Sequence, residues 1–212
     1  MSGRMRIVAG SGLAIGLAAV SYPLLLRRWC LTWGATADEV SRELPGDELL
    51  PDPWIVCTRA VSISAPPGAI WPWIVQIGSS RAGAYSYDWL QNLFGLDMHS
   101  ADVILPQFQD VQIGDEFPLG RGRPKLRVDV LHPERAFTLR LADGSWVWIF
   151  ALFPEDGVTR LVSRSRIAAP GRGATAASWR LLKTFIELGS LVLERKTLLG
   201  IRDRAGEPNH RT

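Results

Sequence analysis

The Asp-Gly pairs Asp143-Gly144 and Asp156-Gly157 constrain the fold of this chain more than any other feature. The first pair separates AFTLRL, in which apolar and polar residues alternate, from SWVWIFALF, and the second separates SWVWIFALF from TRLVSRSRI. Because Asp-Gly favours the tight turn of a hairpin, these three segments are predicted to be consecutive antiparallel strands. The middle segment has large apolar residues on both faces, so it is predicted to be a central strand or to be covered on both sides.

Further elements are predicted upstream of these hairpins. Trp54–Ser64 is rich in β-branched residues and KLRVDVL alternates, so both are predicted strands. Between them, a first short helix is predicted to begin at the prolines 66 and 67 and to end at Gly78. A second short helix is predicted in SYDWLQNLFG, with Ser86 as its N-cap and Gly95 as its stop.

A long helix is predicted at Ala176–Arg204, with two stripes of opposite character. The apolar stripe contains Trp179, Leu182, Phe185, Ile186, Val192, Leu193 and Leu199, and the polar stripe contains Arg180, Lys183, Glu187, Ser190, Glu194 and Thr197. Such a helix buries apolar surface when it lies across the concave face of a curved antiparallel sheet. The predicted fold class is therefore α+β, with a cavity between the helix and the sheet that the two short helices close at one end.

The uncharged segment Ile7–Leu26 is long enough to cross the hydrocarbon core of a bilayer, which needs about 20 residues. Trp29 and flanking arginines resemble the interfacial anchors of a spanning helix, so an N-terminal transmembrane helix is expected. A cleaved signal peptide is the alternative, although the apolar run is longer than a usual signal core. Two arginines lie on each side, so the positive-inside rule leaves the side of the membrane undetermined.

The predicted organisation has four parts: a membrane anchor at residues 1–29, a linker at 30–53, one folded domain at 54–205 and a polar tail at 206–212. Within the linker, Thr36 and Glu39 have the spacing of a helix capping box. The sequence assigns no oligomeric state.

Charge and cysteine usage argue against several classes of function. The chain has a net charge of +3 and no long basic block, so no nucleic-acid partner is expected. Cys30 and Cys57 form no Cys-x-x-Cys pair and have no histidine cluster nearby. Two free thiols, no metal site and no cofactor are therefore expected.

The element order, with SISAPPGAIWPWIVQIG between the first strand and the first helix, resembles the START and birch-pollen-allergen helix-grip superfamily, usually labelled SRPBCC. The resemblance covers about residues 54–204. RAGAYSYDWLQNLFGLDMHSADVILPQFQDVQIGD and the lead-in WGAT…EV…LPGDEL are similar to a bacterial subgroup of polyketide cyclase-like proteins. This resemblance implies a cavity under the long helix that binds hydrophobic small molecules or lipids, or that supports cyclisation or dehydration.

The stretch after the first short helix supplies most candidate ligand contacts: Arg81, Tyr85, Tyr87, Asp88 and Trp89. The phenols could bond the polar end of a ligand, Asp88 could act as a general base, and Arg81 could hold a carboxylate or phosphate. The alternative is structural, with Asp88 paired to Arg81 or capping the helix and the tyrosines packing the corner. No catalytic residue is assigned, because no histidine or cysteine partner is visible.

Three further candidates lie downstream. Trp146 and Trp148 share a strand face and line the cavity if that face is concave, with ordinary core packing as the alternative. Gln109 could supply a polar contact, with a turn role as its alternative. The three arginines of TRLVSRSRI fall on one face of their strand, which is expected to be the solvated outer face.

Three functions are consistent with these features. The first is membrane-tethered binding of a hydrophobic small molecule or lipid in the internal cavity, with residues 7–26 in the membrane. The second is a cyclase or dehydratase type of enzyme that uses the same cavity, with Asp88 and a tyrosine as its acid-base pair. The third is a non-catalytic membrane-associated scaffold, whose sign would be a contiguous exposed apolar patch.

Overall fold

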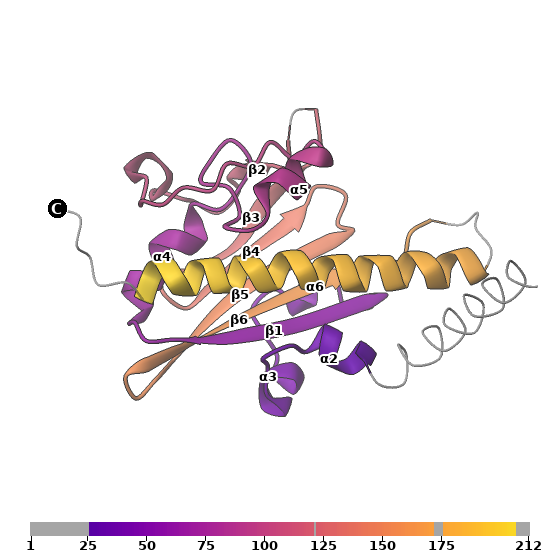
Figure 1. Ribbon diagram of the computed structural model, residues 1–212, viewed down its shortest axis with the longest axis horizontal. Coiled ribbons are helices and arrows are strands. Elements are labelled where there is room, and N and C mark those ends of the chain that lie inside the picture. Colours follow the sequence, from indigo (N-terminus) through magenta and orange to yellow (C-terminus); the bar gives the residue numbers. More distant parts are fainter. Residues whose placement is uncertain (1–25, 121, 172–175, 207–212) are drawn as a thin grey trace, which may run out of the picture.

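The computed structural model describes residues 26–120, 122–171 and 176–206. It has the predicted α+β class, because the strands form one curved antiparallel sheet and a long C-terminal helix lies across one of its faces (Figure 1). The sheet order is β1-β6-β5-β4-β3-β2, with β1 paired to the last strand of the chain. The strands are β1 (Ile55–Ile63), β2 (Glu116–Pro118), β3 (Lys125–His132), β4 (Ala136–Leu141), β5 (Trp146–Glu155) and β6 (Val158–Ile167).

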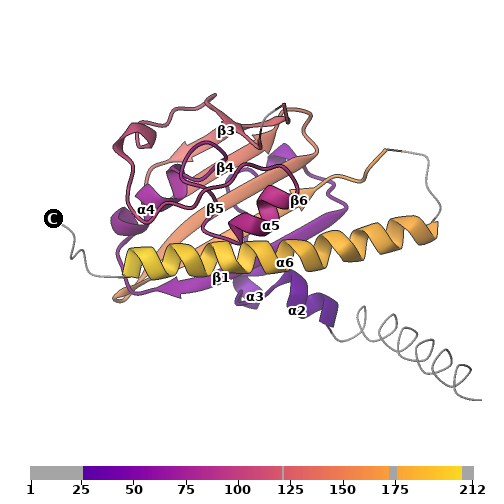
Figure 2. The same cartoon turned by 45° about the horizontal axis from the view of Figure 1, so that its top comes forward.

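The helices lie around α6, the long C-terminal helix, which packs against β1, α4 and α2. In both views α4 and α5 lie on one side of α6, and α2 and α3 lie on the other (Figures 1 and 2). The helices are α2 (Arg27–Leu31), α3 (Ala37–Ser41), α4 (Pro67–Val75), α5 (Asp88–Leu93) and α6 (Ala176–Gly206), with 3₁₀ turns at Asp47–Leu49 and Pro106–Phe108.

Most of these elements agree with the patterns that predicted them, with one correction. The capping box of Thr36 and Glu39 is present at the start of α3, and the proline pair begins α4. The predicted N-cap Ser86 is wrong, because the cap position of α5 is Tyr87. Ser86 instead donates its hydroxyl to the Leu193 carbonyl oxygen of α6 at 2.9 Å, so it joins two helices.

Both faces of the sheet are covered by apolar contacts, as the pattern of β5 indicated. The face toward α6 carries Phe137 and Phe150 in the main core, together with Leu198 of α6. The opposite face carries Val147 and Ile149, which pack with Leu44 in a second core. The chain therefore builds a three-layer arrangement, in which the sheet is the middle layer.

Residues 33–51 form the third layer and are fastened to β6 by arginines. Arg160 donates to both carboxylate oxygens of Glu39 at 2.8 Å. Arg164 is only 3% exposed, and it contacts Asp47 and the carbonyl oxygens of residues 39, 40 and 42. Arg166 also bonds Asp47, at 3.1 Å. The expectation of a solvated arginine face is therefore wrong, because residues 33–51 cover it and accept its hydrogen bonds.

Helix α6 is oriented opposite to the usual rule for a surface helix. Its polar stripe faces the sheet, where Glu187, Glu194 and Thr197 are buried. Its apolar residues Leu181 and Phe185 are instead exposed, at 74% and 68%. Sequence periodicity predicted an apolar and a polar stripe. Toward the N-terminal end of α6, however, the stripe that faces the sheet is the polar one.

The C-terminal half of α6 approaches the loop between α4 and α5 so closely that only glycine fits. A Cβ built on Gly200 would lie 2.7 Å from the Cβ of Tyr85 and inside van der Waals contact of the Tyr85 carbonyl oxygen. Tyr85 itself has a left-handed backbone, with φ of 52°, which costs free energy that the surrounding contacts must supply. Gly200 therefore fixes where α6 crosses the corner after α4.

The predicted anchor, residues 7–26, lies outside the described residues except for Leu26. Within the part of the chain that the structure describes, no helix is both long enough and apolar enough to cross a membrane.

Replacing Asp47 should destabilise the domain, because it would leave the buried Arg164 guanidinium without its carboxylate. We expect Asp47→Ala to lower the free energy of unfolding by about 3 kcal/mol in urea denaturation. The control is Asp38→Ala, which removes an exposed i,i+4 ion pair with Arg42 and should cost less than about 0.5 kcal/mol. Equal effects of the two substitutions would contradict a stabilising role for the buried ion pair between Asp47 and Arg164.

Adding one methyl group at Gly200 should also destabilise the domain, because the backbone of Tyr85 cannot move aside. We expect Gly200→Ala to lower the thermal midpoint, with a loss of roughly 1–3 kcal/mol. Gly189→Ala is the matched control on the same helix, since nothing lies within 4 Å of its added Cβ. That variant should be neutral or stabilised, because alanine favours a helix over glycine. A neutral Gly200→Ala would refute the close approach.

Candidate ligand site

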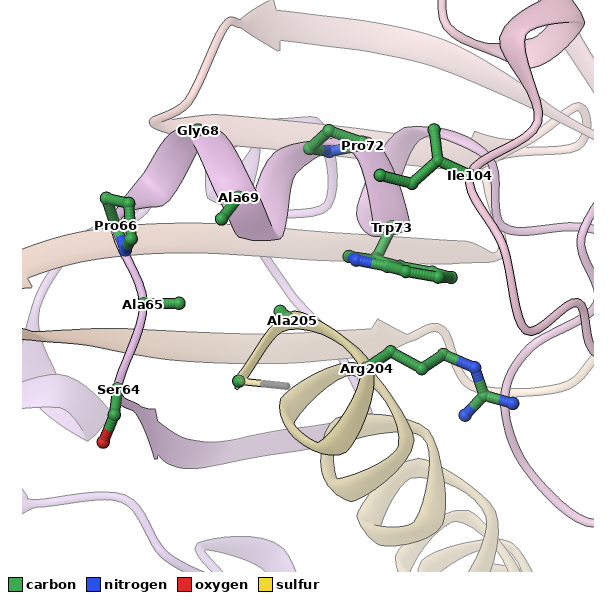
Figure 3. Close-up of a pocket in the computed structure, with 11 residues that line it drawn as sticks. Ser64, Ala65, Pro66, Gly68, Ala69, Pro72, Trp73, Ile104, Arg204 and Ala205 are labelled. Carbon is green, nitrogen blue, oxygen red and sulfur yellow. The ribbon is translucent and has the colours of Figure 1, made fainter. Parts of the chain in front are cut away.

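A pocket of about 430 Å³ lies where α4 meets the C-terminal end of α6. Figure 3 shows the small side chains of Ala65, Ala69 and Ala205 bordering this space from three different elements, with the Trp73 ring as a further wall. Ile104 covers it from the loop before β2. The pocket is thus open because alanines stand where larger side chains would fill the corner.

Proline chemistry shapes the α4 wall of this pocket. Pro66 is the N-cap of α4 in an extended conformation, and Pro67 follows as the first helical residue, where the missing N–H costs nothing. Pro72 lies inside the same helix and also lines the pocket. Pro66 and Pro72 therefore contribute apolar ring surface to the pocket.

Arg204 is the charged residue at the pocket, and its guanidinium is held by the chain itself. It donates to the Ala101 carbonyl oxygen at 2.9 Å and to Asp102 at 2.6 Å. The guanidinium also lies over the Tyr85 ring, 4.9 Å from its centroid. Arg204 therefore ties the end of α6 to the loop that carries Ile104.

Tyr85, a predicted ligand contact, lies in the core beside this pocket. Its hydroxyl donates to the Trp73 carbonyl oxygen at 3.0 Å and accepts from Gln76 at 2.9 Å. Burial raises the pKa of the Tyr85 phenol above its ordinary value, so the phenol remains protonated. Its hydroxyl is thus committed to fixing α4 against the loop that follows it.

Arg81 lies between two aromatic rings. Its guanidinium carbon is 4.4 Å from the Phe108 centroid and 4.1 Å from that of Phe117, a cation–π arrangement. It donates to the carbonyl oxygens of Val75 and Phe108. Burial lowers the pKa of Arg81, and its Nε has no partner among the described residues.

Asp88 does not pair with Arg81, and it is not one of the residues that line the pocket. Its carboxylate accepts from the Ser100 amide and from the Ser100 hydroxyl, both at 2.7 Å. These bonds hold the loop after α5 against the start of that helix. Asp88 therefore holds this loop against α5, and its role as an acid-base group stays a prediction.

The remaining candidates are exposed or hydrogen-bonded to neighbouring segments: Tyr87, Trp89 and Gln109. Tyr87 and Trp89 are exposed at the start of α5, Trp89 by 70%. Gln109 donates to the Gln76 amide oxygen at 3.1 Å. Gln76 is fully buried and also accepts from the Leu105 amide at 2.9 Å. It is a hub that sequence reasoning missed, since a single glutamine after an apolar run gives no signal of its own.

Trp146 and Trp148 lie on the face of β5 that looks toward α6. Their rings are stacked, with centroids 5.6 Å apart and planes 20° apart. The Trp148 indole donates to the Ser163 hydroxyl at 3.0 Å, whereas the Trp146 Nε1 is buried without a partner in the described part of the chain. Their face is the one that the cavity hypothesis required, and their role in ligand binding stays a prediction.

Beneath α6 lies a buried ion pair that sequence reasoning missed. Arg59 of β1 is 0% exposed and pairs with Glu194 of α6. Glu194 also accepts from the Ser163 hydroxyl, and Arg59 donates to Ser190 at 3.0 Å and to the Cys30 carbonyl oxygen at 3.1 Å. Burial opposes the charged guanidinium, but Glu194 and its neighbours raise the pKa of Arg59 above its ordinary value.

The sequence did contain a signal for this pair. Arg59 stands at an inward position of a strand whose neighbours are apolar, and Glu194 stands in the polar stripe of α6. An inward charge of this kind requires an opposite charge from the covering element. Matching the two would have predicted which stripe of α6 faces the sheet.

The cysteines are free, as predicted, and both are buried. Cys57 lies beside Ser190, and burial raises the pKa of its thiol to about 11, which makes it a poor nucleophile. Among the described residues, no cluster of three or more histidine, cysteine, aspartate or glutamate side chains is arranged to hold a metal ion.

Solved structures similar to this chain have low sequence identity to it. A polyketide cyclase-like protein from Corynebacterium glutamicum is 18% identical with a TM-score of 0.41, covering 74% of this chain and 96% of that one. The KanY protein is 18% identical with a TM-score of 0.47, covering 72% and 98%. The Aha1 dimer from Colwellia psychrerythraea is 13% identical with a TM-score of 0.37, covering 72% and 96%. No protein-family model and no curated protein matches.

One of these similar structures is described as polyketide cyclase-like.

Removing Glu194 should leave the buried positive charge of Arg59 without its carboxylate partner. We expect Glu194→Ala to lower the free energy of unfolding by roughly 3–5 kcal/mol in chemical denaturation. The double variant Arg59→Met/Glu194→Leu replaces the pair with apolar side chains of similar size and should recover most of this loss. If the double variant is as unstable as Glu194→Ala, an unpaired Arg59 charge is not the cause of the instability.

Proposed function

We propose that this protein binds a hydrophobic small molecule or lipid, and that residues 7–26 hold it at a membrane. The observation that carries the binding role is the pocket between α4 and the end of α6. Its volume of about 430 Å³ falls within the range of small-molecule sites, which is about 300–1,000 Å³. Its walls combine the apolar side chains of alanine, proline, isoleucine and tryptophan with polar groups that include Ser64 and Arg204, so a ligand would bury apolar surface against the former.

The polar groups around the pocket favour a binding role over an enzymatic one. Arg204 and the Tyr85 hydroxyl have partners within the chain, and Asp88 bonds Ser100. Recognition is therefore expected to depend on shape and apolar area, with few directional contacts. Trp73 offers a flat surface against which an aliphatic chain or ring can pack.

The membrane tether is the second part of the proposal, and its support is sequence alone. Ile7–Leu26 is uncharged and long enough to span a bilayer, with arginines on both sides. A binding domain held at a membrane meets apolar ligands at their highest local concentration, since lipids partition there.

Filling the pocket should abolish ligand retention without unfolding the protein. We expect full-length protein purified from its own host to carry an apolar ligand in native mass spectrometry and in an organic extract. Ala205→Trp should lose that ligand, because the indole occupies the pocket. Arg202→Trp is the matched control, since it adds the same group on the exposed side of the same helix.

Circular dichroism melts check that both tryptophan variants remain folded. A wild-type protein without ligand would overturn the binding role, and a ligand retained equally by Ala205→Trp would exclude this pocket as its site.

A further inference from the structure

The N-terminal half of α6 displays an unusual exposed surface. Leu181, Phe185, Leu188 and Val192 all point outward, with exposed fractions of 74%, 68%, 43% and 47%. At 3.6 residues per turn these four positions lie within about 60° of one another and extend over about 17 Å of helix. We call this set the α6 stripe.

The α6 stripe is flanked by positive rather than negative charge. The acidic residues of this stretch, Glu187 and Glu194, are turned inward and buried. Arg180 and Arg195 are exposed at its two ends. The outward surface of this half-helix is therefore apolar and basic, which is the composition of helices that lie in the interface of an anionic bilayer.

Helix α2 holds Leu26, the end of the apolar N-terminal segment, against the same half of α6. Arg27, the residue after that segment, donates to Glu187 of α6 at 2.8 Å. The Cys30 thiol donates to the Glu187 carbonyl oxygen at 3.2 Å. Glu187 is turned inward in the same part of α6 that carries the α6 stripe, so α2 and Leu26 are held at the flank of this half-helix.

Two exposed residues of α2 extend the surface. Leu26 and Trp29 are 53% and 56% exposed, and Arg28 between them is also exposed. Tryptophan is the side chain most suited to the headgroup level, because its ring is apolar and its N–H can reach water.

We infer that the α6 stripe, together with Trp29, inserts into the headgroup region of the membrane that residues 7–26 enter. This inference rests on the tether of the proposed function and adds an orientation to it: α6 lies along the bilayer surface. A second copy of the chain is a poorer occupant, because a two-fold contact through this surface would bring its exposed arginines together. The bilayer offers apolar depth for the leucines and anionic groups for the arginines at once.

Helix α5 carries further exposed apolar side chains. Its start is tied to α6 by the bond from Ser86 to the Leu193 carbonyl oxygen. Trp89, Leu93 and Phe94 are all more than half exposed. This position gives the predicted ligand residue Trp89 a second role, as a contact for lipid next to the α6 stripe.

Site-specific fluorescence on the full-length chain tests the inference. Phe185→Cys and Leu188→Cys each provide a labelling site for the environment-sensitive fluorophore NBD, while the native cysteines are buried. Ile113→Cys is the matched control, because Ile113 is 67% exposed and lies in the loop before β2, at the sheet edge farthest from β1. The labelled proteins are reconstituted into vesicles of phosphatidylcholine and phosphatidylglycerol, with and without brominated lipid.

We expect brominated lipid to quench the labels at positions 185 and 188 several-fold more than the label at 113. Labels at 185 and 188 that are quenched by aqueous iodide instead would overturn the inference. Labels shielded from both quenchers would also overturn it, because a protein surface, such as a second copy or the N-terminal segment itself, would then cover the stripe.

Flotation of the same vesicles separates failure of this inference from failure of the tether. Protein that floats with the vesicles while its stripe labels stay in water retains the tether but lacks the proposed orientation. Protein that does not float lacks the tether, and the inference fails with it.

Discussion

The buried ion pair between Arg59 and Glu194 determines how the long helix lies on the sheet. Arg59 comes from the middle of β1 and is fully removed from water, so it requires a carboxylate from whatever element covers that strand. Glu194 supplies it, and the Ser163 hydroxyl bonds the other oxygen of the same carboxylate. Because α6 must turn this glutamate inward, the residues opposite to it must turn outward.

The two halves of α6 consequently have different inner surfaces. In the C-terminal half, Leu198 and Ile201 belong to the main core, and the helix ends at the alanine-lined pocket. Nearer the N-terminal end, Ser190 and Glu194 bond Arg59 of the sheet, and the buried Glu187 carboxylate bonds Arg27 of α2. One helix therefore combines an ordinary core-packing end, beside which a ligand site can form, with an inverted end that leaves its apolar residues uncovered.

Local patterns in the sequence predicted the elements of this fold well. The Asp-Gly turns and the alternation around them are properties of a few adjacent residues, so β4, β5 and β6 follow from them almost to the residue. Helical periodicity, which is also local, gives α6. The orientation of α6 could not be obtained this way. Periodicity gives two stripes, but which one faces inward depends on a strand residue more than 130 positions away.

The candidate site shows the same limit of local reasoning. The cluster after α4 was chosen for its chemical side chains, and the structure shows Asp88 bonded to Ser100 and Arg81 bonded to the carbonyl oxygens of Val75 and Phe108. The alanines that leave the pocket open carry no chemical signal in a sequence. Their effect appears only when α4, the end of β1 and the end of α6 converge. The structural role of the β6 arginines likewise depends on residues 33–51, which cover them and accept their hydrogen bonds.

Helix α2 has a mechanical consequence for a chain that is tethered by its N-terminus. A flexible linker after an anchor lets a domain rotate freely and explore a hemisphere around its attachment point. Here Arg27 and Cys30 are bonded to α6, and the Cys30 carbonyl oxygen accepts from Arg59 of β1. The chain therefore has no slack from Arg27 onward, so an anchor of the proposed kind would be attached at a fixed point on α6.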